Sequence, residues 1–299
     1  MNTALRITAF TAGLAASFGL ALGVGHATGS PSPKPAMAGH PGHTGHAAET
    51  EGAGGGAGHA SGEHPPGGLQ VSEDGYTLSV DTPFVTAGSP TDLRFRILGT
   101  DGTPVTAYQR QHEKELHLIV APRDLSTFQH LHPTLAADGT WSAPTDIPAA
   151  GEYRVFADFT PAGRNEGLTL GADLHAAGDL RPAPLPETGR TVTVDGYTVT
   201  LDGDLTPGHS GPLTLNVSKD GTPVTDLQPY LGAYGHLVAL RAGDLGYLHV
   251  HPDTTAPGPG IGFTTTAPSA GSYRLFLDFR HQDTVHTAAF TLTAATPQH

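Results

Sequence analysis

The chain repeats itself, and this feature constrains its fold more than any other. Three blocks in the second half match three blocks in the first half, in the same order and at nearly the same offset. The clearest match joins residues 150–159 (AGEYRVFADF) to residues 270–279 (AGSYRLFLDF). Three collinear matches do not arise by chance, so two copies of one sequence must adopt the same fold. The boundary between them falls in the proline-rich stretch 181–189.

Each copy has the pattern of short β-strands. Apolar and polar residues alternate in segments such as residues 76–80 and 213–217, which is the period of a strand with one buried face. Asp-Gly pairs mark the turns, and no segment shows a helical stripe. Copies of roughly 110 residues with about seven strands have the size of an immunoglobulin-like sandwich. We therefore predict an all-β protein with two tandem immunoglobulin-like β-sandwich domains, residues 69–184 and 185–299.

Tyr153 and Tyr273 occupy equivalent positions in the repeated block. Each opens a late strand of its copy, where immunoglobulin-like domains place a tyrosine whose hydroxyl ties the chain corner. We expect a structural role for both.

Residues 1–29 have the pattern of a signal peptide or an N-terminal membrane anchor. Arg6 precedes an uncharged apolar run at residues 7–24, and small residues follow around Ala27. This order is typical of a cleaved secretory signal, but the run is also long enough to cross a bilayer as an uncleaved anchor. Both alternatives place the remainder outside the cytoplasm. We expect an extracytoplasmic protein, secreted or anchored to the cell membrane, that meets the membrane only through this segment.

Residues 30–68 contain no Val, Ile, Leu, Phe, Tyr or Trp. Such a segment cannot bury a core, so we predict a disordered linker rich in His, Gly and Pro. His40, His43 and His46 recur at every third residue. They either wrap a cation such as Cu²⁺, Ni²⁺ or Zn²⁺ weakly, or belong to a polar spacer that is histidine-rich.

Three histidine positions recur in both copies with the same spacing. They are His117, His130 and His132 in the first copy and His236, His249 and His251 in the second. Histidines two residues apart in a strand point to one face, about 7 Å apart. The residues before them also look like a strand, so a hairpin is expected. A register that pairs residue 117 with 130 or 132 brings those side chains to about 5 Å from one another.

Three imidazoles that converge from two strands can coordinate a metal ion at about 2.0–2.1 Å. The chain has no Cys and two Met, so imidazole and carboxylate are the donors at hand. They suit copper(II) and zinc(II), and the Irving–Williams order favours copper(II). Such a site should lose its ion as histidine protonates below about pH 6. The alternative is a hydrogen-bonded histidine cluster that stiffens the hairpin.

Neighbouring residues complete this hypothesis. Asp158 and Asp278 are paired between the copies and serve either as a fourth ligand or acceptor for a ligand histidine, or as exposed strand-end acids. His175 and His286 are candidate extra donors. Leu131 and Val250 should face the core, while Phe128 and Tyr247 lie on the histidine side and could shield the site from water. In each turn, Asp124 and Asp244 are expected to shape the backbone.

Composition excludes other functions. The chain has 15 Lys and Arg against 28 Asp and Glu, a formal charge of −13, which argues against nucleic-acid binding. No Ser-His-Asp arrangement, phosphate-binding loop or carboxylate pair is recognisable, so we expect no enzymatic activity.

Three stretches carry a resemblance to a known family: residues 124–133 (DLSTFQHLHP), 138–141 (DGTW) and 151–159 (GEYRVFADF). They resemble actinobacterial secreted or membrane-anchored proteins associated with heavy-metal transport and copper resistance. The architecture is similar to that of extracytoplasmic CopC- and YtkA-like sandwiches, although this sequence lacks their methionine-rich copper(I) site. The resemblance implies a non-enzymatic role in metal sequestration, resistance or hand-over, with a metal transporter or another extracytoplasmic protein as partner. The alternative is a tandem immunoglobulin-like cell-surface interaction module with structural histidine clusters.

Overall fold

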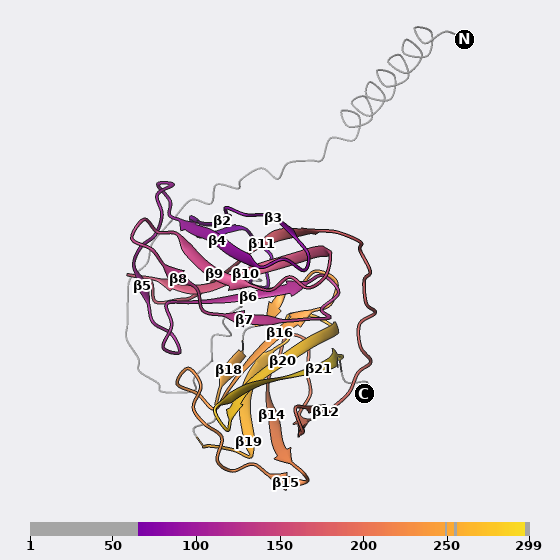
Figure 1. Cartoon of the computed structure of the whole chain (residues 1–299). Coiled ribbons are helices and arrows are strands. Elements are labelled where there is room, and N and C mark those ends of the chain that lie inside the picture. Colours follow the sequence, from indigo (N-terminus) through magenta and orange to yellow (C-terminus); the bar gives the residue numbers. More distant parts are fainter. Residues whose placement is uncertain (1–64, 249, 254–255, 297–299) are drawn as a thin grey trace, which may run out of the picture. The chain divides into compact units, whose positions relative to one another are not determined.

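A computed structural model describes residues 65–248, 250–253 and 256–296. Over these ranges the protein is all-β, as the alternating pattern predicts (Figure 1). The same ranges hold no helix that is long and apolar enough to cross a membrane. Outside the described residues lie the predicted signal or anchor segment 1–29 and residues 30–64 of the predicted linker, including His40, His43 and His46.

The first repeat is a sandwich of two sheets. One sheet has the strand order β1-β2-β4-β9-β8, formed by β1 (Ser72–Glu73), β2 (Tyr76–Val80), β4 (Thr91–Leu98), β9 (Trp141–Thr145) and β8 (Thr134–Leu135). The other has the order β3-β11-β10-β6-β7, formed by β3 (Phe84–Thr86), β11 (Leu168–Ala177), β10 (Gly151–Pro161), β6 (Leu116–Pro122) and β7 (Gln129–Leu131), with β5 (Tyr108–Gln109) paired to β10. Only the β3–β11 pair is parallel among the paired strands described. The chain therefore passes from the first sheet to the edge of the second between β2 and β3.

The second repeat has the same two-sheet plan. One sheet has the order β12-β13-β14-β19-β18, formed by β12 (Thr191–Val194), β13 (Tyr197–Asp202), β14 (Ser210–Lys219), β19 (Gly260–Thr266) and β18 (Val250–Pro252), with β15 (Thr222–Pro223) paired to β14. The other has the order β17-β16-β20-β21, formed by β17 (Tyr247–Leu248), β16 (Gly235–Arg241), β20 (Gly271–His281) and β21 (Thr284–Ala294).

Each repeat encloses its own apolar core, built from alternate residues of its strands. The two corner tyrosines behave as predicted. The Tyr153 hydroxyl donates to the Ala149 carbonyl at 2.9 Å, and the Tyr273 hydroxyl donates to the Ser269 carbonyl at 2.8 Å. Both hydrogen bonds fasten the chain immediately before an 11-residue strand, β10 or β20.

A third apolar cluster joins the two repeats. Strand β6 is buried at every position, because Leu118 faces the core of its own repeat while Ile119 faces the other repeat. Ile119 and Phe156 gather there with Val238 and Phe276. A strand with both faces buried is apolar along nearly its whole length, and β6 reads LHLIVAP. Its one histidine, His117, points to the same side as Ile119, toward the second repeat.

The segment before β1 also links the repeats. The Tyr247 amide of β17 donates to the Gly67 carbonyl at 2.9 Å. At Gly68, where φ is +73°, a Cβ atom would lie 2.4 Å from the Phe156 ring. A Cβ atom at Gly171 would lie 2.0 Å from the Gly68 carbonyl oxygen. Glycine is therefore required at both positions for the segment to lie this close to the sheet.

Candidate metal centre

The β6–β7 hairpin positions the three histidines of the first repeat. Ile119 lies opposite His130, and Leu118 lies opposite Leu131, which is one of the two predicted registers, with residue 117 opposite residue 132. Residues on one face of a strand alternate, so the three histidine side chains share the face of Ile119. Leu131 points the other way and packs against the first core, as predicted.

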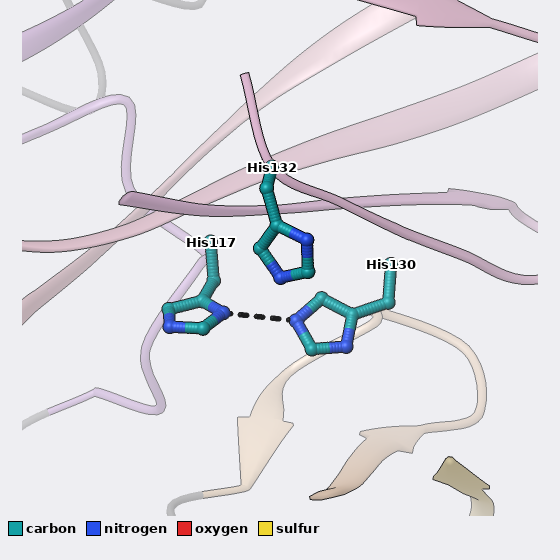
Figure 2. Close-up of side chains that lie close together, drawn as sticks. All are labelled: His117, His130 and His132. Atoms are coloured by element: carbon teal, nitrogen blue, oxygen red, sulfur yellow. Dashed lines mark hydrogen bonds between the residues drawn. The ribbon is translucent and has the colours of Figure 1, made fainter. Parts of the chain in front are cut away.

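The three imidazole rings converge (Figure 2). His117 Nδ1 lies 3.0 Å from His130 Nε2. The ring centre of His132 lies 5.2 Å from that of His117 and 4.9 Å from that of His130. One ring nitrogen from each histidine falls within 4.8 Å of the others. His117 is 8% exposed, and the His130 side chain is 5% exposed, so the cluster is largely shielded from water.

The outer hydrogen bonds determine which ring nitrogens carry protons. His117 Nε2 lies 3.1 Å from the Gln111 carbonyl oxygen, which can only accept. His130 Nδ1 lies 3.0 Å from a carboxylate oxygen of Asp278. In a neutral imidazole the other nitrogen then carries a lone pair. When both rings are neutral, the lone pairs are therefore on His117 Nδ1 and His130 Nε2, the two atoms that face each other at 3.0 Å.

His132 adds a third nitrogen without a hydrogen-bond partner. Its Nε2 atom is buried, and among the described residues no group donates to it or accepts from it. A buried polar atom that lacks a partner is costly, and such atoms often mark a functional site. Three nitrogens available as acceptors thus meet in one place, an arrangement that suits a cation.

The second repeat contributes to the same place. Asp278 lies on β20, opposite His236 of β16, and accepts hydrogen bonds from His130 Nδ1 and, at 2.6 Å, from the Thr287 hydroxyl. The His236 ring centre lies 6.0 Å from that of His130. Asp278 is therefore an acceptor for a candidate ligand of the other repeat, whereas the sequence suggested a role within its own copy.

The second repeat does not reproduce the hairpin of the first. Ala239 lies opposite Leu248, so β16 and β17 keep the equivalent register. The chain then leaves this sheet, and His251 lies opposite Thr264 of β19 in the other sheet. The expected pairing of His251 with His236 is therefore wrong, because β17 ends at Leu248. His249 lies outside the described residues. Val250 packs against the second core, as predicted.

Burial governs the protonation of the cluster. Burial, with a smaller contribution from His130, lowers the pKa of His117 and that of His132 to about 3. It also lowers the pKa of His236 to about 4. His117, His132 and His236 are thus neutral at pH 7, and each retains a lone pair.

Asp158 lies on β10 directly opposite His117. It is not bonded to a histidine in the described structure; its Oδ1 accepts a hydrogen bond from the Thr169 hydroxyl at 3.3 Å. Burial raises the pKa of this carboxyl group to about 6. Asp158 and the histidines line one cavity of about 70 Å³. Residues of both repeats line it, among them His117, His130, Asp158, His236, Val238 and Tyr247.

The remaining residues selected from the sequence take other positions. His175 pairs with Glu152 at 2.5 Å and His286 bonds Asp195 at 2.8 Å, so the suggestion that they are extra donors at this site is wrong. Asp124 and Asp244 shape turns as predicted, because each accepts a backbone N–H two residues further on.

Two residues of the site escaped the sequence reasoning. His112 lies with its ring centre 5.1 Å from that of His236, and Tyr230 covers His132 and His236 at 6.2 and 5.7 Å. His112 has no histidine counterpart in the second copy, so the repeat comparison could not select it. Its only signal was its closeness in sequence to His117.

Fold and site together define a tandem immunoglobulin-like β-sandwich protein with a histidine cluster between its repeats. A family model described as a domain of unknown function, DUF8832, matches the chain twice, over residues 70–173 and 192–296. The chain belongs to this family. Among curated proteins, none matches it.

Solved structures show distant similarity. The Escherichia coli adhesin FdeC is 20% identical with a TM-score of 0.24, and the match covers 75% of this chain and 65% of the adhesin. The Yersinia pseudotuberculosis adhesin InvE is 14% identical with a TM-score of 0.24, covering 76% of this chain and 60% of the adhesin. A Salmonella alpha-2-macroglobulin is 14% identical with a TM-score of 0.27, covering 78% and 15%. The chain spans less than two thirds of each of these proteins, and the scores are too low for their roles to be carried over.

Proposed function

We propose that the protein binds one divalent transition-metal ion, copper(II) in preference to zinc(II), between its two repeats and outside the cytoplasm. His117, His130 and His132 are the ligands. The observation that carries the proposal is the 3.0 Å approach of His117 Nδ1 to His130 Nε2. Each ring already donates from its other nitrogen to an oxygen, so in the neutral rings two lone pairs oppose each other unless a metal cation lies beside both or an added proton lies between them.

The surroundings of the ligands support the same proposal. Ligand histidines in metal sites donate their second ring N–H to a carboxylate or a backbone carbonyl, which orients the ring and raises its basicity. Asp278 serves His130 in this way and the Gln111 carbonyl serves His117. The third nitrogen, His132 Nε2, is buried and has no partner among the described residues, so an ion would satisfy it.

Geometry and donor type favour copper(II). Two nitrogens 3.0 Å apart, each about 2.0–2.1 Å from one ion, subtend an angle of about 90–97° at that ion. This angle is closer to the tetragonal geometry of copper(II) than to a tetrahedron. Imidazole ligation also places copper(II) above zinc(II) in the Irving–Williams order.

Burial of two of the proposed ligands extends the pH range over which we expect the ion to stay bound. Ordinary histidines would release a metal below about pH 6, but burial lowers the pKa of His117 and His132 to about 3. Protons therefore compete weakly with the ion at these two ligands, and we expect affinity to persist to about pH 5.

Titration calorimetry of the full chain with Cu²⁺ and with Zn²⁺ tests the proposal. We expect one saturable site in addition to any binding by the histidine-rich linker. The double variant His130→Ala/His132→Ala should lose that site, whereas His209→Ala should keep it, because His209 is exposed and bonds the Pro207 carbonyl. Retention of the site in the double variant would contradict the proposal, as would the absence of any saturable site from the wild-type chain.

The cellular role follows from the location and the chemistry of the site. A buried ion in an exported protein would be sequestered from water, or handed on to a metal transporter or another extracytoplasmic partner. The N-terminal segment supports export, and the resemblance to metal-associated secreted proteins supports this role. Proteinase treatment of intact cells, with immunoblotting of the chain, would test whether it lies outside the cytoplasm.

A second candidate function is a cell-surface interaction module in which the histidines are structural. One added proton on His130 would complete a hydrogen-bonded chain from Asp278 through His130 and His117 to the Gln111 carbonyl. This chain would hold the two repeats together without a metal. It leaves His132 Nε2 without a partner, which is why we prefer the metal site. A partner protein that binds equally well with and without EDTA would favour this alternative.

A further inference from the structure

A cleft leads from the surface to the histidine cluster. It has a volume of about 550 Å³ and shares His117, Asp158 and Tyr247 with the smaller cavity beside the ligands. Its outer part is lined by exposed residues, including Glu166. An ion that reaches the buried ligands from solvent through this cleft passes His112, which lines both the cleft and the cavity.

The backbone at His112 is unusual. Residues Gln111 and Lys114 close a two-residue turn with amide-to-carbonyl hydrogen bonds of 2.8 and 3.0 Å. Both central residues are left-handed, with φ of 48° at His112 and 65° at Glu113. Turns of this kind favour Asn-Gly or Asp-Gly. The second repeat forms the same turn between Tyr230 and Ala233, with Gly232 at the second central position. The first repeat has the pair His112-Glu113 there, which is unfavourable in this conformation, and strained residues that persist in folded proteins cluster at functional sites.

His112 begins a series of closely spaced rings. Its ring centre lies 5.1 Å from that of His236 and 6.1 Å from that of His117. His236 lies in turn 6.0 Å from His130. The Tyr230 carbonyl accepts a hydrogen bond from His236 Nε2 at 2.7 Å, so the lone pair of this ring is on Nδ1. An ion could therefore exchange ligands in short steps from the exposed ring to the buried ones.

We infer that His112 and His236 form a transit site, at which a Cu²⁺ or Zn²⁺ ion is captured before it passes to His117, His130 and His132 and through which it leaves. The inference rests on the proposed function. No bond other than metal–ligand bonds forms or breaks in this exchange. The hydrated ion releases waters into the cleft as imidazole nitrogens replace them, and its oxidation state does not change.

The variant His112→Asn tests the inference. Asparagine tolerates the left-handed backbone of the turn but has no imidazole, so the hairpin should be preserved. His209→Asn is the matched control on an exposed histidine away from the cleft. Both are made in the full chain with the five linker histidines, His40, His43, His46, His59 and His64, replaced by alanine, so that the linker cannot deliver Cu²⁺.

The readouts are the rate of Cu²⁺ loading in stopped flow, the rate of extraction by EDTA, and the equilibrium Kd. We expect His112→Asn to slow loading and extraction by about tenfold, the low end of what a pre-positioned capture group contributes. The Kd should stay within about twofold of the control, because both rates fall together. Unchanged rates would overturn the transit site. So would a Kd that weakens with unchanged loading, since His112 would then be a resting ligand. A background chain that binds no Cu²⁺ at all would instead refute the proposed function.

Discussion

The two repeats share one histidine pattern but use it differently. In the first repeat, His117, His130 and His132 converge on one point. In the second, β17 ends at Leu248 and His251 joins the other sheet, while His236 and Asp278 turn toward the site of the first repeat. The comparison shows that duplication supplied two similar surfaces, and that their association produced one combined site.

The apolar part of the interface keeps the symmetry of the duplication. Phe128 of the first repeat stacks on Phe276 of the second, with ring centres 4.4 Å apart. The equivalent residues of the opposite repeats, Tyr247 and Phe156, lie 6.0 Å apart. Both equivalent aspartates accept a hydrogen bond from a threonine of their own repeat. The polar part departs from this symmetry because Asp278 also bonds a histidine across the interface, whereas Asp158 bonds no histidine in the described structure. Divergence therefore concentrates where the site lies.

The largest effect should come from breaking the symmetric apolar contacts. Phe156→Ala and Phe276→Ala each empty a buried position between the repeats, so each should lower the free energy of unfolding by about 3–5 kcal/mol. Denaturant unfolding followed by fluorescence measures this. Phe84→Ala is the matched control, since Phe84 is 77% exposed and its loss should cost less than about 0.5 kcal/mol. Equal losses for buried and exposed positions would show that the repeats do not associate through this cluster.

Alanine substitution of two equivalent histidines compares the contributions of the two repeats to Cu²⁺ binding. His117→Ala removes a proposed ligand and should weaken Cu²⁺ binding by more than about 100-fold, whereas His236→Ala should weaken it by about tenfold or less. Competition with a chelator of known affinity measures both. Similar losses at the two positions would mean that the second repeat supplies a ligand on equal terms.

The equivalent aspartates provide a finer test. Asp278→Asn replaces the acceptor of His130 and should weaken Cu²⁺ affinity about 10–100-fold. Asp158→Asn should change the affinity by less than about threefold, since Asp158 makes no hydrogen bond to a candidate ligand in the described structure. If the order of the two effects were reversed, Asp158 would be a ligand and Asp278 would have only a structural role.

The smallest expected effect is a pH-dependent difference in stability at Asp158. Burial raises the pKa of its carboxyl group to about 6, above the ordinary 3.8. Its favourable contribution to folding is therefore complete below pH 3.8 and is lost as the pH rises through 6. Asparagine does not titrate. The free energy of unfolding of Asp158→Asn should therefore rise relative to that of the wild type by on the order of 1–2 kcal/mol between pH 4 and pH 7.

Denaturant unfolding of both chains at pH 4.5 and pH 7.5 measures the difference. The histidines with a lowered pKa act in the opposite sense. The contribution of His117, His132 and His236 to the free energy of unfolding is lost as the pH falls from 6.5 toward 3. They are present in both chains and cancel in the comparison. A stability difference that is the same at both pH values would contradict the raised pKa.

Local patterns in the sequence were enough to predict the strands, the corner tyrosines and one of the two candidate registers of the β6–β7 hairpin. Each depends on contacts between residues close together in the chain or on the two-residue period of a strand. Leu131 and Val250 could be placed on the core side for the same reason. These inferences needed no knowledge of what lies across the sheet.

Only the tertiary structure decided that the histidine faces of the two repeats meet. The apolar residues on the outer faces, Ile119 and Val238 among them, show that a surface is buried but not which surface covers it. The pairing of His130 with Asp278 joins residues 148 positions apart. The second copy forms the same turn between Tyr230 and Ala233 but has Leu231 where the first has His112, so the repeat comparison could not show that His112 joins the site. The sequence therefore determined two sandwiches and a repeated set of imidazoles. The docking of two apolar faces, whose burial is non-directional, brought those groups into a single site.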